Sequence, residues 1–136
     1  MTLFLFDTPF MAALVNNRPG AVAIASPWIA AGEAATSALV YAEVMEYIKP
    51  SQRYVRHYVR LHELLMDLHL YFPTLAILER YADIRLALRR GRLIGDMDTL
   101  IAATALEFDL TIVTIDPDFQ RVPGLQVMLL TREELL

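Results

Sequence analysis

The sequence predicts an α/β fold, a three-layer sandwich in which a central, mostly parallel sheet of four to five strands is flanked by helices. Three observations predict it. Short apolar runs typical of buried strands alternate with longer segments of helical periodicity. Two of these runs end directly in an aspartate, where a parallel sheet would place its ligand-binding edge. No repeat or linker-like stretch interrupts the chain, so residues 1–136 should form a single domain.

The chain opens with a predicted strand, an acid and a helix. Residues 2–6 (TLFLF) form an apolar run that suits a buried parallel strand and ends at Asp7. Pro9 is well placed as the first residue of a helix, because a helix needs no N–H at that position. Residues 16–20 (NNRPG) have the composition of a loop.

The next elements repeat the alternation. Residues 21–34 predict a helix that is interrupted near Pro27. A strand over residues 36–40 should follow, and a helix over residues 41–48 then carries Glu43.

Two longer helices are predicted in the middle of the chain. The first begins after a Pro-Ser step and runs to about residue 69, because its apolar residues recur at helical spacing on one face. The second covers about residues 74–90 and is stopped by Gly91.

The last part of the chain returns to the sheet. A loop over residues 95–98 precedes an apolar helix over residues 99–108. The strand TIVTI, residues 111–115, then leads directly into Asp116, and a turn precedes a final strand over residues 125–130.

Composition limits the kinds of chemistry that the chain can perform. Without cysteine it has no disulfides, zinc–thiolate sites or thiol catalysis, and a reducing cytoplasm is its natural setting. The N-terminus lacks the basic region of a signal peptide, and the longest charge-free run is too short to span a bilayer. The apolar share of 56% and mean hydropathy of +0.39 exceed what one core needs. We therefore expect an apolar face for self-association, as a homodimer, or for a protein partner.

The net charge of −4 at first argues against nucleic acid as a ligand. Five of the 16 acids are assigned below to a metal site, and the remaining 11 nearly balance the 12 lysines and arginines. The bound cation would add positive charge of its own.

Four acids, Asp7, Glu43, Asp98 and Asp116, are candidates for a divalent-metal site. Each alone has an ordinary explanation, such as a turn or a helix cap, and Asp98 could be the N-cap of its helix. Together they suit a hard cation, because Mg²⁺ prefers oxygen ligands and is typically held by a few carboxylates and substrate phosphate oxygens. The sequence therefore predicts a protein that Mg²⁺ or Mn²⁺ stabilises.

Other kinds of catalytic site have poor support in the sequence. The histidines at positions 57, 62 and 69 share a predicted helix but lack metal-ligand spacing, so we interpret them as structural. No serine has the surroundings of a nucleophile elbow, and no glycine-rich phosphate loop occurs.

Several motifs, taken in order, resemble a known family. LFLFDT, TSALVYAEVMEYI, IGDMDTLIAATALEFDLTIVTID and DFQRVPGL are similar to segments of the PIN-domain ribonucleases, and in particular of the VapC-type toxins of prokaryotic toxin–antitoxin pairs. The resemblance covers nearly the whole chain and is most specific over residues 94–125. It implies a PIN-like sandwich, metal-dependent endonucleolytic hydrolysis of RNA with Mg²⁺ or Mn²⁺, and a cognate antitoxin partner.

The resemblance also assigns roles to individual residues. It makes Asp7, Glu43, Asp98 and Asp116 the catalytic acids, with Asp7, Asp96, Asp98 and Asp116 as metal ligands. Thr8 and Thr114 match positions where a hydroxyl orients these acids. The family usually has Asn where this chain has Pro9, and loss of the amide would alter the hydrogen bonds around Asp7.

Two groups of arginines are candidates for contact with RNA phosphates. Arg53, Arg56 and Arg60 share one helix face, where they can equally be solvated surface. The second group runs into the acidic loop and consists of Arg85, Arg89, Arg90 and Arg92.

Three alternative functions differ from this reading. A haloacid-dehalogenase-like phosphatase would need a second acid where this chain has Pro9, and a response-regulator receiver would need a lysine at the end of a strand, whereas the only lysine is Lys49. A PIN domain that has lost catalysis and acts as an RNA- or protein-binding module is the third.

Overall fold

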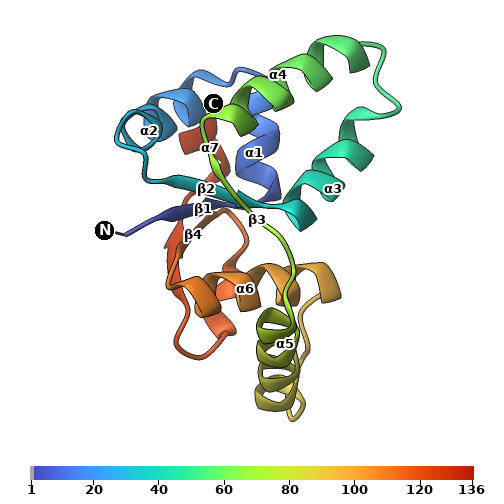
Figure 1. Cartoon of the computed structure of the whole chain (residues 1–136), viewed down its shortest axis with the longest axis vertical. Coiled ribbons are helices and arrows are strands. Elements are labelled where there is room, and N and C mark those ends of the chain that lie inside the picture. The colour runs from blue at the N-terminus through green and yellow to red at the C-terminus, as the bar shows by residue number, and fades with distance from the viewer. Residues whose placement is uncertain (1) are drawn as a thin grey trace.

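A computed structural model describes residues 2–136. Over these residues a single parallel sheet runs through the molecule in the strand order β3-β2-β1-β4-β5 (Figure 1). The strands are β1 (Phe4–Phe6), β2 (Ala34–Ser37), β3 (His69–Tyr71), β4 (Thr111–Thr114) and β5 (Gln126–Leu129). The predicted α/β class with a central parallel sheet is confirmed.

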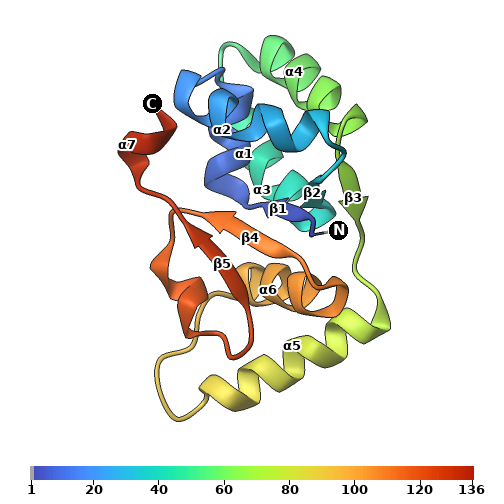
Figure 2. The ribbon, with the colours of Figure 1, turned by 90° about the vertical axis from the view of Figure 1, so that its left-hand side faces the viewer.

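Helices cover both faces of this sheet. Figure 1 shows α1, α2, α3 and α4 on one side and α5 and α6 on the other, and Figure 2 shows the same layers from the side. The helices are α1 (Thr8–Val15), α2 (Pro19–Ala30), α3 (Ala38–Ile48), α4 (Tyr54–Met66), α5 (Leu75–Leu88), α6 (Asp96–Phe108) and α7 (Arg132–Leu135), with a 3₁₀ helix η1 (Pro117–Arg121). Within residues 2–136, no helix is long and apolar enough to cross a membrane.

The centre of the sheet is the strand that ends in the first candidate acid. Leu5 and Phe6 in β1 are fully buried, and β1 pairs with β2 on one side and β4 on the other. The register places Phe6 opposite Val113, and the N–H of Asp7 donates to the Val113 carbonyl at 3.1 Å. Asp7 therefore lies at the carboxyl edge of the two central strands, as the sequence predicts.

The second strand starts two residues earlier and ends three residues earlier than predicted. β2 ends at Ser37, where residues 36–40 were expected to form the strand, and α3 begins at Ala38 instead of residue 41. The Ser37 hydroxyl accepts a hydrogen bond from the N–H of Leu39 at 3.0 Å, so it caps the helix that follows. Ser37 is followed by the apolar residues 38–40, which made the start of the helix look like part of a strand.

The predicted helix after Pro50 and Ser51 is present, but it does not continue to residue 69, and a strand was missed. α4 ends at Met66, and residues 69–71 form β3, an edge strand that pairs with β2. His69 and Leu70 are exposed, so β3 shows no run of buried side chains by which to recognise it. Leu68, which lies within the predicted helix, is buried in the connection between α4 and β3.

The predicted interruption at Pro27 is also wrong. α2 begins at Pro19 and continues through Pro27 to Ala30, so it starts within the expected loop over residues 16–20. Pro27 is exposed, and the carbonyl of Ala23, which its missing N–H leaves without the usual helix partner, belongs to an exposed residue that water can reach.

Candidate metal centre

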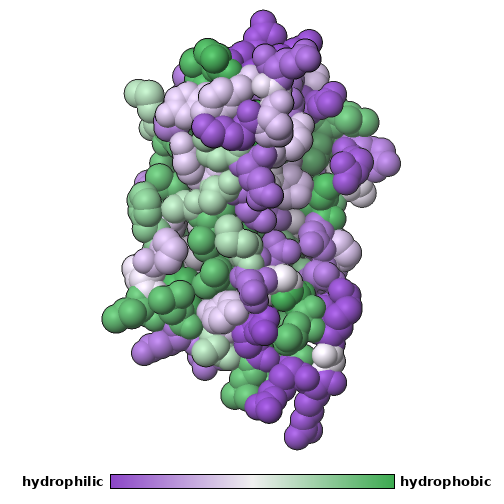
Figure 3. All heavy atoms as spheres, turned by 90° about the vertical axis from the view of Figure 1, so that its right-hand side faces the viewer, coloured by the Kyte–Doolittle hydropathy of each residue, from purple (hydrophilic) through white to green (hydrophobic). Residues whose placement is uncertain are grey.

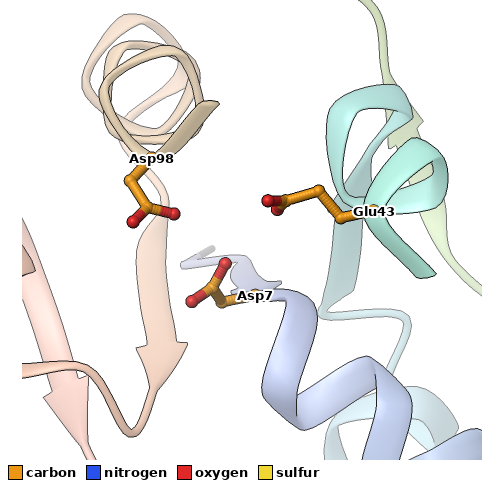
Figure 4. Close-up of side chains that lie close together, drawn as sticks. All are labelled: Asp7, Glu43 and Asp98. Carbon is orange, nitrogen blue, oxygen red and sulfur yellow. The ribbon is translucent and has the colours of Figure 1, made fainter. Parts of the chain in front are cut away.

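Three carboxylates from three distant parts of the chain meet at the carboxyl edge of the sheet. One oxygen from each of Asp7, Glu43 and Asp98 lies within 4.8 Å of the others. Asp7 follows β1, Glu43 lies on α3, and Asp98 lies in the first turn of α6. Figure 4 shows all three side chains pointing toward one another across the space between these elements.

Asp7 is the most buried of the three acids. Its side chain is 2% exposed, and its Oδ2 accepts a hydrogen bond of 2.8 Å from the Thr114 hydroxyl. Its Oδ1 is buried and has no hydrogen-bond partner among residues 2–136. A buried oxygen without a partner is costly, so this atom is where a ligand with positive charge would be most favourable.

Burial is also the main reason why Asp7 titrates unusually. Loss of water around the carboxylate raises the pKa of Asp7 to about 7, and the negative charges of Asp98 and Glu43 add to the rise. Hydrogen bonds from Thr8 N–H and the Thr114 hydroxyl act in the opposite direction.

Asp98 is less buried, and it is not the N-cap that its position had suggested. Gly95 occupies the N-cap position of α6, and Asp98 is the third helical residue. Desolvation raises the pKa of Asp98 to about 6, and the nearby charges of Glu43, Asp116 and Asp118 contribute to the rise. The N-terminal end of α6 favours negative charge, which partly offsets this repulsion.

Hydroxyl groups orient two of the acids. The Thr8 hydroxyl donates to Glu43 Oε1 at 2.5 Å, which ties the start of α1 to α3. The Thr114 hydroxyl donates to Asp7 and also accepts from the N–H of Asp116 at 3.1 Å. Both threonines therefore lie where the resemblance implied that a hydroxyl would hold an acid.

Asp116 lines the same cavity but is not one of the three clustered carboxylates. Its Oδ1 accepts from the N–H of Asp118 at 2.9 Å and caps η1. The cavity has a volume of about 370 Å³. It is lined by Asp7, Thr8, Pro9, Ala12, Glu43, Tyr47, Asp98 and Asp116.

The structure does not bring Asp96 into this cluster. Asp96 Oδ1 accepts from Arg85 at 2.9 Å and from the Tyr81 hydroxyl at 3.0 Å, and its side chain is 72% exposed. Asp96 and Asp98 are two positions apart on α6, which is about 200° of helix rotation, so their carboxylates leave the helix in different directions.

The arginines near the acidic loop divide into paired and unpaired groups. Arg85 binds Asp96, and Arg92 binds Asp118 at 2.8 Å. Arg89 and Arg90 are exposed and line a separate cavity at the end of α5. Of the other group, Arg56 and Arg60 line a surface hollow along α4.

Tyr47, which was not among the predicted site residues, also lines the acid cavity. It follows Glu43 by four residues on α3, so helical spacing places both side chains on the same face. This four-residue spacing from Glu43 is the sequence signal by which Tyr47 could have been predicted.

The donor set fits a hard divalent cation. Carboxylate oxygens are the ligands that Mg²⁺ and Mn²⁺ prefer, and one of those present here is buried without a partner. Asp7, Asp98 and Glu43 are the residues that could hold the ion, with Asp116 at the rim of the same cavity.

Comparison with known proteins gives a family match and several similar structures. The family described as PIN domain matches residues 4–125. A chain in the structure of VapBC2 from Rickettsia felis, bound to a DNA fragment from their promoter, is 23% identical, with a TM-score of 0.86 and coverage of 95% of this chain and 99% of that one. A chain in the DNA-bound VapBC of Salmonella typhimurium is 21% identical, with a TM-score of 0.84 and coverage of 94% and 98%.

A third solved structure is also similar to this chain. A chain of VapBC-1 from nontypeable Haemophilus influenzae is 25% identical, with a TM-score of 0.75 and coverage of 94% of this chain and 98% of that one. No curated protein sequence matches at a significant level.

Proposed function

This chain belongs to the PIN domain family, and from that premise we propose that it is a metal-dependent endoribonuclease, the toxin of a VapBC-type toxin–antitoxin pair. One observation carries the proposal. The carboxylates of Asp7, Glu43 and Asp98 converge within 4.8 Å at the edge of the sheet, and one oxygen of Asp7 is buried without a partner. Such an arrangement is electrostatically unfavourable alone and favourable around a divalent cation.

Each residue of the site has a role in this proposal. Asp7 and Asp98 would bind a Mg²⁺ or Mn²⁺ ion directly, with Glu43 and Asp116 binding through water or holding a second ion. When bound, such an ion activates water for attack on phosphorus and neutralises charge on the phosphate. Thr114 holds the Asp7 carboxylate in one orientation, and Thr8 does the same for Glu43.

The partners in this proposal are RNA as substrate, a cognate antitoxin, and a second copy of the chain. The similar structures are VapBC complexes, which supports an antitoxin as partner. Exposed apolar side chains on α4 and around β3 and α5 support protein contacts, among them Val55 and Met66 on α4 and Phe72 and Leu75 before and in α5. Figure 3 shows apolar patches among hydrophilic side chains on one face of the molecule.

Light scattering on the purified chain should give the mass of a dimer, and a monomer would remove the homodimer from the proposal.

The decisive experiment is a cleavage assay. Purified protein is incubated with total RNA in Mg²⁺ or in EDTA, and the new 5′ ends are mapped. We expect cleavage at discrete positions in Mg²⁺ only, with a 5′-phosphate on the downstream fragment. Asp98→Asn should reduce the rate by more than about 100-fold, because it removes a charged ligand and leaves a side chain of the same shape.

The control for this variant is Asp83→Asn, on α5 and outside the cavity, which should cleave as the wild type does. Circular dichroism should show that both variants are folded. Full activity in folded Asp98→Asn would contradict the assignment.

The alternative function, a PIN domain that binds RNA or protein without cutting, draws support from Pro9. This residue lines the acid cavity where the family usually has Asn, so the cavity lacks that amide. RNA that is bound but remains intact in Mg²⁺ and in Mn²⁺ would favour this alternative.

A further inference from the structure

A second cavity adjoins the acid cavity along α1. It has a volume of about 400 Å³, and three of its residues, Pro9, Ala12 and Tyr47, also line the acid cavity. Ala13 and Asn16 continue its floor along the same helix. The two cavities therefore form one groove that starts at the carboxylates and follows α1 away from them, and we call it the α1 groove.

An aromatic ring stands at the junction of the two cavities. Tyr47 is 55% exposed, although it is a large aromatic side chain beside the acid cluster. Asn16 Nδ2 donates to the Tyr47 hydroxyl at 3.3 Å, which links the ring to the end of α1. Pro9, the departure from the family pattern, is half-buried in the same junction. The junction is thus apolar and aromatic. It separates the acidic end of the α1 groove from its distal end.

The distal end of the α1 groove is basic. Arg18 and Arg132 line it, both are exposed, and neither forms an ion pair with another of residues 2–136. This differs from Arg85 and Arg92, whose guanidinium groups are already bound to carboxylates. Free guanidinium groups are the better phosphate ligands, because no intramolecular ion pair has to break first.

Arg132 is held at the groove by the packing of α7. The N–H of Gly20 donates to the Leu136 carbonyl at 3.1 Å, and a Cβ at Gly20 would lie only 2.2 Å from the Glu134 carbonyl oxygen. Because residue 20 is glycine, α7 can approach the start of α2 this closely. The same contact fixes the position of α7, the helix that carries Arg132.

We propose that the α1 groove binds single-stranded RNA on one side of the bond to be cut, with a base stacked on Tyr47 against Pro9 and the adjoining phosphates bound by Arg18 and Arg132. This inference rests on the proposed ribonuclease function. The eight residues of α1 span about 12 Å, which at the 3.4 Å rise of stacked nucleotides corresponds to roughly three steps. An exposed aromatic ring reads an unpaired base, which is why the ligand is a single strand and not a duplex.

The α1 groove also explains how a chain with a net charge of −4 can bind RNA. The scissile phosphate would approach a site whose net charge is reduced by the bound cation, while the flanking phosphates lie beyond the acids at Arg18 and Arg132. In this arrangement the opposite charges occupy two ends of one groove, and an aromatic platform separates them.

A binding experiment tests this directly. The probe is a fluorescein-labelled single-stranded RNA of mixed sequence, about twelve nucleotides long, and the protein carries Asp98→Asn so that the RNA stays intact. In this background Tyr47→Ala should weaken binding by about 5- to 150-fold, whereas Tyr47→Phe, which keeps the ring, should bind like the parent. Arg18→Ala with Arg132→Ala should lower the slope of log K against log salt by about 0.7 for each arginine removed.

Two controls give the result its meaning. Arg80→Ala removes an arginine on α5 that pairs with Glu107 on α6, away from the groove, and should not change binding. Arg89→Ala with Arg90→Ala removes the rival basic cluster. Weaker binding in this pair, with no effect of the pair in the groove, would overturn the proposal and place the RNA at the end of α5.

Failure of this inference is separable from failure of the proposed function. If the wild type cuts RNA but Tyr47→Ala, in the otherwise native protein, has an unchanged KM, the ribonuclease stands and the α1 groove is refuted. If the wild type neither cuts nor binds RNA, the function itself is refuted. A change of oligomeric mass in Tyr47→Ala would identify Tyr47 as a subunit contact and would also overturn the proposal.

Discussion

Asp7 combines two properties that a residue kept only for stability would not show together. It is almost completely buried, and one of its oxygens has no partner among residues 2–136. Two neighbouring carboxylates face it, so its charged form is disfavoured both by burial and by repulsion. In the absence of a cation the folded protein is therefore less stable with Asp7 ionised than with Asp7 protonated.

The raised pKa of Asp7 determines how the stability of the metal-free protein changes with pH. The pKa of Asp7 rises from 3.8 to about 7 on folding, so between these values the folded state binds more protons than the unfolded state. Stability of the metal-free protein should then fall as the pH rises from about 4 to about 7, and the penalty remains above that range. Asp98, with its pKa raised to about 6, acts in the same direction.

Asp7→Asn should remove this penalty. The amide oxygen can still accept from Thr114, and the amide N–H can donate to a neighbouring carboxylate. One pKa unit corresponds to about 1.4 kcal/mol, so the variant should be more stable than the wild type by on the order of 2–4 kcal/mol at pH 8 in EDTA. Urea unfolding at pH 5 and pH 8 measures the difference, which should be less than half as large at pH 5, because most of the penalty accumulates above that pH.

The matched control is Asp67→Asn, an acid at the end of α4 outside the candidate site. It should change stability little at either pH. An Asp7→Asn variant that is less stable than the wild type at pH 8 in EDTA would show that the ionised carboxylate contributes a favourable contact, contrary to the expectation.

Among the helices and strands, the sequence was most informative where an apolar run is followed by a functional residue. β1 and β4 are buried on both faces, so their position and the acids that follow them could be predicted. β3 could not, because it is a three-residue edge strand with exposed side chains, and its existence depends on pairing with β2. Long-range pairing of this kind leaves no local signal.

The candidate site likewise contains residues that the sequence could identify and residues that it could not. Asp7 and Asp98 could be chosen from their positions after a strand and before a predicted helix, Glu43 was chosen by the family resemblance, and the structure brings the three together. Asp96 was predicted as a metal ligand together with Asp98, because the sequence does not show that α6 starts at Asp96, and this start fixes which of the two faces Glu43. Arg132 was missed because its relation to the acids depends on how α7 packs against α2, whereas Tyr47 had only its spacing from Glu43 as a signal.

The contact between α7 and α2 can be tested at Gly20. In Gly20→Ala the new Cβ would meet backbone atoms of residues 134 and 135 at 2.2 and 2.8 Å, so α7 has to move. We expect a loss of stability of about 1–3 kcal/mol and weaker binding of single-stranded RNA, because Arg132 moves with α7. Urea unfolding and fluorescence anisotropy measure the two effects.

Gly91→Ala is the matched control for that substitution. A Cβ at Gly91 would be 3.9 Å from the nearest atom, the Leu88 carbonyl oxygen, so nothing has to shift. This variant should unfold and bind RNA like the wild type. If the two glycine variants behave alike, α7 is not held by close packing at residue 20.

At the scale of the whole molecule, the carboxylate cluster joins the two layers of helices. Asp7 extends from the central strand, Glu43 belongs to the layer that contains α1 and α3, and Asp98 belongs to the layer that contains α5 and α6 (Figures 1 and 4). Repulsion among the three acids therefore opposes the approach of one layer to the other. A cation bound to all three would reverse the sign of that interaction and connect residues that lie far apart in the sequence.

This arrangement predicts that divalent metal stabilises the entire fold. At a free Mg²⁺ or Mn²⁺ concentration of about 100 times the dissociation constant, binding to the native state alone adds about 2.7 kcal/mol, which for a domain of this size raises Tm by on the order of 5–10 °C. Calorimetry at pH 8 in EDTA and in millimolar metal measures the shift. Asp7→Asn combined with Asp98→Asn should show almost none, although its metal-free Tm should exceed that of the wild type. An equal shift in this double variant would place the bound ion elsewhere, and an unchanged Tm in the wild type would count against a metal centre at these carboxylates.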